Sequence, residues 1–236
     1  MYRKHAQIYD LIYSNKDYQQ DSERVQKFIE RYKQSSGNDL LEVACGSGNY
    51  LHYLKNQFNC TGIDINEGIL NVAKKKVKGV RFLKGNMINF SLHKKFDVIA
   101  CLFSSIGYVK TYENLHKTIT NFYNHLNQGG VVIIEPWISP ENFKAGESHL
   151  KTYQDENIKI ARLDVSQRKG NLSILDFHFV VAERDKNVIH FTDRHELGLF
   201  DTPRTLNVMK KIGLESRFIK DKKERYYRGA FIGVKN

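Results

Sequence analysis

Short apolar runs alternate with amphipathic stretches along the first 135 positions of the chain. The segments between the runs, such as Glu67–Val77 and Glu113–Leu126, carry apolar residues at helical spacing. Nearly continuous apolar strands that alternate with helices are typical of a parallel sheet covered on both faces. We therefore predict an α/β, doubly wound, Rossmann-like sheet. Its first five strands are expected at 40–44, 60–65, 80–83, 96–101 and 131–135.

The pattern changes after about position 140. Three long runs with partial alternation, 158–168, 172–183 and 188–200, are divided by polar turns and predict antiparallel hairpins. The α/β pattern then resumes with a helix over Pro203–Ile212 and two final strands, Leu214–Lys220 and Arg228–Val234, which bring the expected total to seven. We predict a main domain formed by 1–140 and 201–236 and an inserted antiparallel β subdomain over 141–200. The inserted sheet could cover a substrate or pair two subunits in a homodimer.

The first 36 residues also show helical spacing of apolar side chains. Tyr9, Tyr13 and Tyr18 are followed by Val25 and Ile29 in this segment. We expect helices that lie over the ligand-binding edge of the sheet as a lid, although tyrosines at the wet rim of a core would give the same pattern.

Composition and charge narrow the class of protein. The 236 residues suffice for one core with an appendage. The net charge of +11 favours anionic partners, but its lysine clusters are scattered, which indicates a solvated surface more than a nucleic-acid footprint. The three cysteines lie in apolar runs without C-x-x-C spacing, and no histidine spacing suggests a metal site. The N-terminus lacks an export signal and no apolar run could span a bilayer, so we expect a cytoplasmic protein without a membrane partner.

A glycine-rich turn follows the first strand, at Gly46-Ser47-Gly48. Such a turn lets backbone N–H groups and the start of the next helix face a ligand, and Asp64 ends the second strand, where a carboxylate can bind both ribose hydroxyls. Dinucleotides and S-adenosylmethionine (SAM) both suit this arrangement. Leu51 occupies the position of the third glycine of a dinucleotide fingerprint, and the anion of Glu42 would repel a pyrophosphate. Both observations favour SAM, which carries an ammonium and a sulfonium.

Further along the chain, Gly85-Asn86-Met87 forms a polar loop after the third strand. An amide and a backbone N–H at this place could bind an adenine edge.

Several motifs together allow a comparison with a known family. They are Tyr9-Asp10 with Tyr13, Lys16-Asp17-Tyr18, Glu42-Val43-Ala44-Cys45-Gly46-Ser47-Gly48, Phe103-Ser104-Ser105-Ile106-Gly107-Tyr108, Glu135-Pro136-Trp137 and Arg228-Gly229-Ala230-Phe231. With these motifs the chain resembles class I SAM-dependent methyltransferases, and more closely the nucleotide-linked aminosugar N-methyltransferases. The resemblance implies SAM as cofactor and a small, phosphate-bearing acceptor. Where that family usually has Asp, this chain has Asn86, whose amide would meet the adenine amino group through a weaker contact.

Site residues follow from the loop motifs and from the resemblance. We expect the cofactor to be bound by Tyr18, Glu42, Ala44, Gly46, Gly48, Asp64, Ile65, Asn86, Met87 and Leu102. The acceptor is expected to contact Tyr9, Tyr13, Ser104, Tyr108, Trp137 and Arg228, and Arg228 could hold a diphosphate with its planar guanidinium.

Methyl transfer from a sulfonium needs a neutral amine placed in line with the methyl group. Tyr13 and His125 are the candidates for taking the proton of the amine, although a histidine near a helix C-terminus is stabilised there without any catalytic role. Two other functions remain open: a tRNA or rRNA methyltransferase, and a noncatalytic SAM-binding regulator or partner subunit. Against the first, the fourth strand is followed by Leu102-Phe103-Ser104-Ser105 and not by an Asn/Asp-Pro-Pro-aromatic signature.

Overall fold

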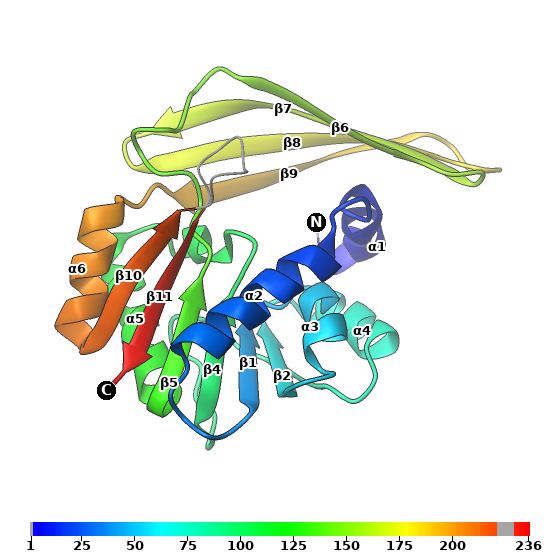
Figure 1. The fold of residues 1–236 in the computed structure, drawn as a ribbon. Coiled ribbons are helices and arrows are strands. Elements are labelled where there is room, and N and C mark those ends of the chain that lie inside the picture. The colour runs from blue at the N-terminus through cyan, green and yellow to red at the C-terminus, as the bar shows by residue number, and fades with distance from the viewer. Residues whose placement is uncertain (1, 221–228) are drawn as a thin grey trace.

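Two β-sheets form the fold of the computed structural model, which describes residues 2–220 and 229–236 (Figure 1). The larger sheet consists of β1 (Asp39–Val43), β2 (Asn59–Asp64), β3 (Arg81–Lys84), β4 (Phe96–Cys101), β5 (Leu126–Ile134), β10 (Leu214–Lys220) and β11 (Gly229–Lys235). Its seven strands lie in the order β10-β11-β5-β4-β1-β2-β3. The order reverses on either side of β1, which confirms the predicted doubly wound, Rossmann-like sheet.

The larger sheet is not wholly parallel. Strands β1 to β5 are parallel, whereas β11 runs antiparallel to both β5 and β10. The reason is the length of the chain between β10 and β11, since residues 221–228 are too few for the crossover helix that a parallel connection needs. The sheet is therefore mixed at one edge.

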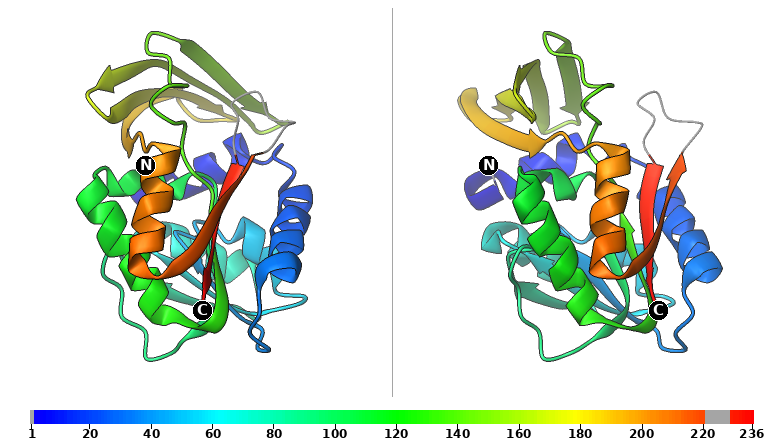
Figure 2. Two further views of the ribbon diagram at one scale, coloured as in Figure 1. Left: turned by 60° about the vertical axis from the view of Figure 1, so that its left-hand side comes forward. Right: turned by 90° about the vertical axis from the view of Figure 1, so that its left-hand side faces the viewer.

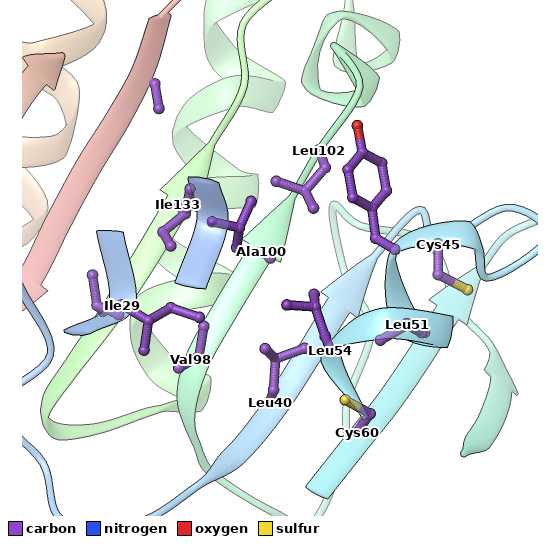
Figure 3. Packing of buried hydrophobic residues seen from close by; sticks show 14 of the residues in the cluster. Ile29, Leu40, Cys45, Leu51, Leu54, Cys60, Val98, Ala100, Leu102 and Ile133 are labelled. Atoms are coloured by element: carbon purple, nitrogen blue, oxygen red, sulfur yellow. The ribbon is translucent and has the colours of Figure 1, made fainter. Parts of the chain in front are cut away.

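Helices cover both faces of the larger sheet (Figure 2). One face carries α2 (Tyr18–Tyr32), α3 (Asn49–Leu54) and α4 (Glu67–Lys76), and the other carries α5 (Tyr112–His125) and α6 (Thr202–Ile212). Successive strand residues point to opposite faces, so that Leu40 and Val98 pack beneath α2 and α3 (Figure 3), while Leu41 and Ile99 pack against α5. This two-sided core holds the carboxyl ends of the parallel strands at one fixed edge.

The smaller sheet lies across that edge (Figure 1). It consists of β6 (Ser148–Gln154), β7 (Ile158–Lys169), β8 (Leu172–Glu183) and β9 (Ile189–Gly198), each antiparallel to the next. Strand β6 was not predicted, because the mostly polar residues of this edge strand give no apolar alternation. The domain limits at 140/141 and 200/201 stay a prediction, whereas the inserted antiparallel sheet itself is confirmed.

Two short elements connect the sheets. Ile8 and Ile12 of α1 (Tyr2–Ile12) pack against the inner face of the smaller sheet in a third apolar cluster. The 3-10 helix η1 (Ser105–Val109) follows β4 and contacts β9, where a Cβ on Gly107 would lie only 2.9 Å from Leu197 Cβ. Among the described residues, no helix is both long and apolar enough to cross a membrane.

Candidate active site

A cavity of about 770 Å³ lies between the two sheets, at the carboxyl ends of the parallel strands. It brings together most of the residues that the sequence singled out. Of the expected cofactor and acceptor residues, its lining includes Tyr9, Tyr13, Tyr18, Glu42, Ala44, Gly46, Asp64, Ile65, Asn86, Met87, Leu102, Ser104, Tyr108 and Trp137. Gly48 and His125 do not line it, and Arg228 lies outside the described residues. One continuous cavity thus joins the glycine turn to the inner face of the smaller sheet.

The glycine turn fixes the position of Asp64. Ala44 and Gly46 adopt left-handed backbone angles, with φ of 57° and 55°, which turn the Gly46 N–H toward the end of β2. That N–H donates to Asp64 Oδ2 at 3.0 Å, and the Asn66 N–H donates to Oδ1 at 2.9 Å. Burial raises the pKa of Asp64, against the effect of these hydrogen bonds. Each carboxylate oxygen keeps a lone pair for a ligand hydroxyl.

Glu42 lies beside Asp64 in the cavity wall and is only 2% exposed. Among the residues that the structure describes, none is hydrogen-bonded to its Oε2, and burial together with the charges of Asp64 and Glu135 raises the pKa of Glu42 well above the usual value. A buried polar atom without a partner is destabilising by about 1–3 kcal/mol. A cationic ligand group would supply the missing partner, so this end of the cavity fits the ammonium of SAM.

Gly48 has a role in packing. It adopts φ of 77° at the start of α3, and a Cβ there would lie 3.1 Å from the ring of Phe82. The close approach lets α3 pack on the sheet, which explains a glycine at this position without a ligand contact.

The loop after β3 supplies the other wall of this end of the cavity. Asn86 Oδ1 accepts from the Ile88 N–H at 3.0 Å, which holds the loop in a tight turn and presents Met87 to the cavity. Tyr18, at the start of α2, packs edge-on against Tyr50, and burial raises its pKa to about 12. Its hydroxyl therefore stays protonated and can donate a hydrogen bond.

The loop after β4 is held in a strained conformation. Phe103 and Ser104 have φ of 51° and 62°, values that residues other than glycine rarely adopt. Glu135, at the end of β5, accepts from the Phe103 N–H at 2.7 Å and forms an ion pair with Arg24 of α2. Ser104 Oγ donates to the Pro136 carbonyl at 2.8 Å. Strain of this kind is maintained by its surroundings and is concentrated at functional sites.

A chain of hydrogen bonds leads away from the cavity through Tyr108. The Tyr108 hydroxyl lies 2.6 Å from His195 Nδ1, and His195 Nε2 lies 2.8 Å from Asp193 Oδ2. Burial alone would raise the pKa of Asp193, but its hydrogen bond with His195 holds this pKa below its usual value. The ionised Asp193 favours the tautomer of His195 that carries its proton on Nε2, which leaves Nδ1 free to accept the Tyr108 proton.

The inner face of β7 carries a second polar group in the cavity wall. Arg162 Nη1 donates to the Tyr13 hydroxyl at 2.6 Å, and His149 Nδ1 lies 3.0 Å from Asp164 Oδ2. Five polar residues of the cavity wall and the Tyr108 chain were not among the residues expected from the sequence: Arg162, Asp164, His149, Asp193 and His195. For Arg162, Asp164, Asp193 and His195 the signal was polar residues at alternate positions of predicted strands, whereas His149 lies on the unpredicted β6. Only the docking of the smaller sheet shows that this face of it meets the cavity.

His125 is a correction to the expected catalytic pair. Its Nε2 accepts from the Leu92 N–H at 3.1 Å, and its Nδ1 lies 2.8 Å from the Asn121 carbonyl. The ring also packs on Phe90, with 4.5 Å between the ring centroids. Because both nitrogens bond to backbone groups outside the cavity, His125 ties the end of α5 to the loop before β4 and is not placed to take a proton from a ligand.

The lid helix α1 is attached to the glycine turn by Asp10. Asp10 Oδ1 accepts from Ser47 Oγ at 2.6 Å, and Oδ2 pairs with Lys76 of α4 at 2.6 Å. Burial would raise the pKa of Asp10, but the hydrogen bonds from Lys76, Ser47 and Asn49 hold it below its usual value. The contacts of Asp10 with Ser47 and Lys76 therefore hold α1 over the cavity, as expected of a lid.

Comparison with known proteins identifies the family. The family model described as a methyltransferase domain matches residues 40–130. The chain is 34% identical over 233 residues to the dTDP-3-amino-3,4,6-trideoxy-alpha-D-glucopyranose N,N-dimethyltransferase of Streptomyces venezuelae, covering 98% of this chain and 97% of that protein. The chain belongs to the methyltransferase family.

Solved structures agree with this assignment. The crystal structure of Streptomyces venezuelae DesVI has a TM-score of 0.91 and 33% identity, and the alignment covers 99% of both chains. The sugar N-methyltransferase KedS8 from Streptoalloteichus sp ATCC 53650 has a TM-score of 0.87 and 30% identity, with 97% of this chain and 92% of that chain covered. The protein is a SAM-dependent methyltransferase, as the resemblance predicted.

Proposed function

We propose that this methyltransferase transfers a methyl group from SAM to the amino group of a nucleotide-linked aminosugar. The observation that carries the proposal is the single cavity with two chemically different ends. One end presents the buried carboxyl group of Glu42 and the partly buried one of Asp64, and polar side chains of the inserted sheet cover the other end. A relative named as a dTDP-aminosugar N,N-dimethyltransferase, 34% identical over 98% of this chain, supports the same acceptor.

The cofactor end divides its tasks among the residues described above. We assign the ribose hydroxyls to Asp64, the ammonium to Glu42, and the adenine to the loop of Asn86 and Met87. When bound, SAM would supply its sulfonium methyl group for in-line transfer to the amine nitrogen, with neutral S-adenosylhomocysteine as the leaving group. Leu102 and the strained Phe103–Ser104 turn close this end against the acceptor, so that water is kept from the reacting methyl group.

The acceptor end has to hold the sugar and remove one proton from its ammonium. Tyr108 lines the cavity and is bonded to His195, so we assign the proton path to this pair. The amine gives its proton to the Tyr108 oxygen while the phenolic proton moves to His195 Nδ1, and Asp193 stabilises the resulting imidazolium. Tyr13, bonded through its hydroxyl to Arg162, is a positioning residue in this scheme.

Phosphate groups of the acceptor need positive charge near the cavity. Lys144 and Lys151 both line it, and the Lys151 ammonium lies 3.9 Å from the centre of the Tyr13 ring. We propose that they attract the diphosphate. The expected role of Arg228 in binding the diphosphate stays a prediction.

The proposal is tested with labelled SAM and a panel of amino-sugar nucleotides beside total tRNA. Methylation of at least one dTDP-aminosugar, with no label in tRNA, is the expected result. Label in tRNA without label in any sugar nucleotide would favour the RNA methyltransferase, and SAM binding without turnover on either would favour the regulator. Mass spectrometry of the product then shows whether one or two methyl groups are added.

A further inference from the structure

We propose that Arg162 and Asp164 of β7 form a binding site for a ring hydroxyl of the acceptor sugar. Asp164 Oδ1 accepts a hydrogen bond from the hydroxyl, and Arg162 Nε donates one to its oxygen. The inference rests on the proposed function, because it assigns a specificity site within the same cavity.

Burial and missing partners single out this pair. Arg162 is 9% exposed and Asp164 is 5% exposed, and both line the cavity. Within the described chain, Asp164 Oδ1 and Arg162 Nε are buried atoms with no hydrogen-bond partner. Two charged groups are rarely buried together with unbonded atoms, because leaving such atoms unpaired is destabilising. The arrangement is therefore that of a site completed by a ligand.

Neighbouring side chains hold the pair in place. Arg162 donates through Nη1 to the Tyr13 hydroxyl at 2.6 Å, and its guanidinium carbon lies 4.1 Å from the centre of the Phe177 ring. Asp164 Oδ2 lies 3.0 Å from His149 Nδ1, which leaves Oδ1 as the oxygen without a bond. Arg162 Nη2 is 3.7 Å from Asp164 Oδ1, which is too long for a hydrogen bond. The two atoms without partners therefore belong to neighbouring side chains of the same cavity wall.

The chemistry of the two free atoms identifies the ligand group. A hydroxyl both donates and accepts, so it satisfies a carboxylate oxygen and a guanidinium N–H at once. A phosphate only accepts and would be repelled by Asp164, whereas an ammonium only donates and would be repelled by Arg162. A neutral sugar hydroxyl is the group that fits both.

Position supports a hydroxyl on the sugar ring more than one elsewhere in the nucleotide. Tyr13 accepts a hydrogen bond from Arg162 through its hydroxyl, and its ring packs edge-on against Phe103, with 5.2 Å between the ring centroids. Phe103 belongs to the turn that closes the cofactor end. Tyr13 therefore links the pair to the turn that, under the proposed function, lies beside the reacting methyl group, where the sugar that carries the amine has to lie.

Comparing wild type and Asp164→Asn on two acceptors distinguishes the loss of a hydroxyl contact from a general loss of structure in the variant. One acceptor is dTDP-3-amino-3,6-dideoxy-alpha-D-glucopyranose, which has hydroxyls beside its amine. The other is dTDP-4-amino-2,3,4,6-tetradeoxy-D-glucose, whose ring lacks a free hydroxyl. For Asp164→Asn we expect KM to rise about tenfold with the first acceptor and less than twofold with the second, with SAM affinity unchanged.

Arg162→Lys, which keeps the charge but loses Nε, should show the same selectivity for the hydroxyl-bearing acceptor. If the melting temperature of Asp164→Asn shows that this variant does not fold, Arg162→Lys is used in its place. The matched control is Asp176→Asn on β8, the same change on the opposite face of the sheet, which should alter neither KM.

Three other results would overturn the inference. Equal losses with both acceptors, or no loss with either, would contradict hydroxyl binding while leaving the proposed function intact. The third result concerns binding itself, which calorimetry measures by titrating each sugar nucleotide into the wild-type complex with S-adenosylhomocysteine. If neither sugar nucleotide binds, the proposed function fails and this inference fails with it.

Discussion

The Tyr108 hydroxyl of η1 is hydrogen-bonded to His195 Nδ1 of β9, at 2.6 Å. The two residues are 87 positions apart in the chain, and the contact exists because Gly107 lets η1 approach Leu197 of the inserted sheet. The pair gives the first prediction. Tyr108→Phe should lower kcat at neutral pH about 100-fold, because general acid–base help of this kind is worth roughly that factor, and SAM affinity should be unchanged.

The pH–rate profile is the measurement that separates proton transfer from simple loss of packing. Without the relay, the rate should follow the fraction of neutral amine and rise steeply with pH. His195→Gln should produce the same steeper profile, whereas Tyr53→Phe on α3, outside the cavity, should not. Full activity of Tyr108→Phe at neutral pH would show that solvent takes the proton.

Asp64 should determine much of the affinity for SAM. Removing its carboxylate leaves the ribose hydroxyls unpaired, so Asp64→Ala should weaken binding by about 2–3 kcal/mol. Isothermal calorimetry measures this change. Asp39→Ala, at the opposite end of the strands, serves as control and should bind SAM normally. Unchanged affinity in Asp64→Ala would refute the assignment.

As the pH is lowered, SAM binding should begin to weaken at a higher pH than it would if Asp64 had the pKa of an ordinary aspartate. Burial raises the pKa of Asp64, and only the ionised form accepts two hydrogen bonds from the ribose. As pH falls through this raised pKa, the carboxylate is lost and affinity declines from a pH above the usual 3.8 of an aspartate. Calorimetric titrations with SAM over a range of pH measure this for wild type, Asp64→Asn and Glu42→Gln. The affinity of each variant should depend less on pH than that of the wild type. Identical pH dependence in all three would contradict the prediction.

Gly107 should be needed for the docking of the inserted sheet. A Cβ at this position would lie 2.9 Å from both Leu197 Cβ and Leu197 Cδ2, so Gly107→Ala has to displace η1 or β9. We expect a loss of about 1–3 kcal/mol of unfolding free energy, measured by urea denaturation, and a higher KM for the acceptor. Gly146→Ala is not a clean control because Gly146 has φ of 85°, so Ile189→Ala on the exposed part of β9 serves instead. An acceptor KM equal to that of wild type would contradict the prediction.

The contact of Asp10 with Ser47 and Lys76 should slow the release of SAM. Asp10→Ala removes both bonds from α1, and because the Lys76 pair is partly exposed, the expected effect is a rise of about 3- to 10-fold in the dissociation rate. Stopped-flow measurement with a SAM analogue tests this. Glu113→Gln removes a surface ion pair on α5 and should leave the rate unchanged. No change in Asp10→Ala would show that α1 is not a lid for the cofactor.

Much of the cofactor end was determined by local sequence. The mostly apolar segment 40–43, the glycines at 46 and 48 and the acid at 64 all lie between positions 40 and 64, and they fix a strand, a turn and the end of the next strand. Parallel strands bring their carboxyl ends to one edge, so residues expected there were found in one cavity. The physical reason is that backbone geometry and strand alternation act over short distances along the chain.

The acceptor end was decided only by the tertiary structure. Arg162 and Asp164 are polar residues of an alternating strand, and nothing in their local pattern distinguishes a solvated face from a face that closes a cavity. His125 shows the opposite case, since its position in the sequence suited catalysis but its nitrogens are bonded to the backbone at Leu92 and Asn121. Contacts between residues far apart in the chain depend on how two sheets pack, and that packing is set by the whole core and not by any one segment.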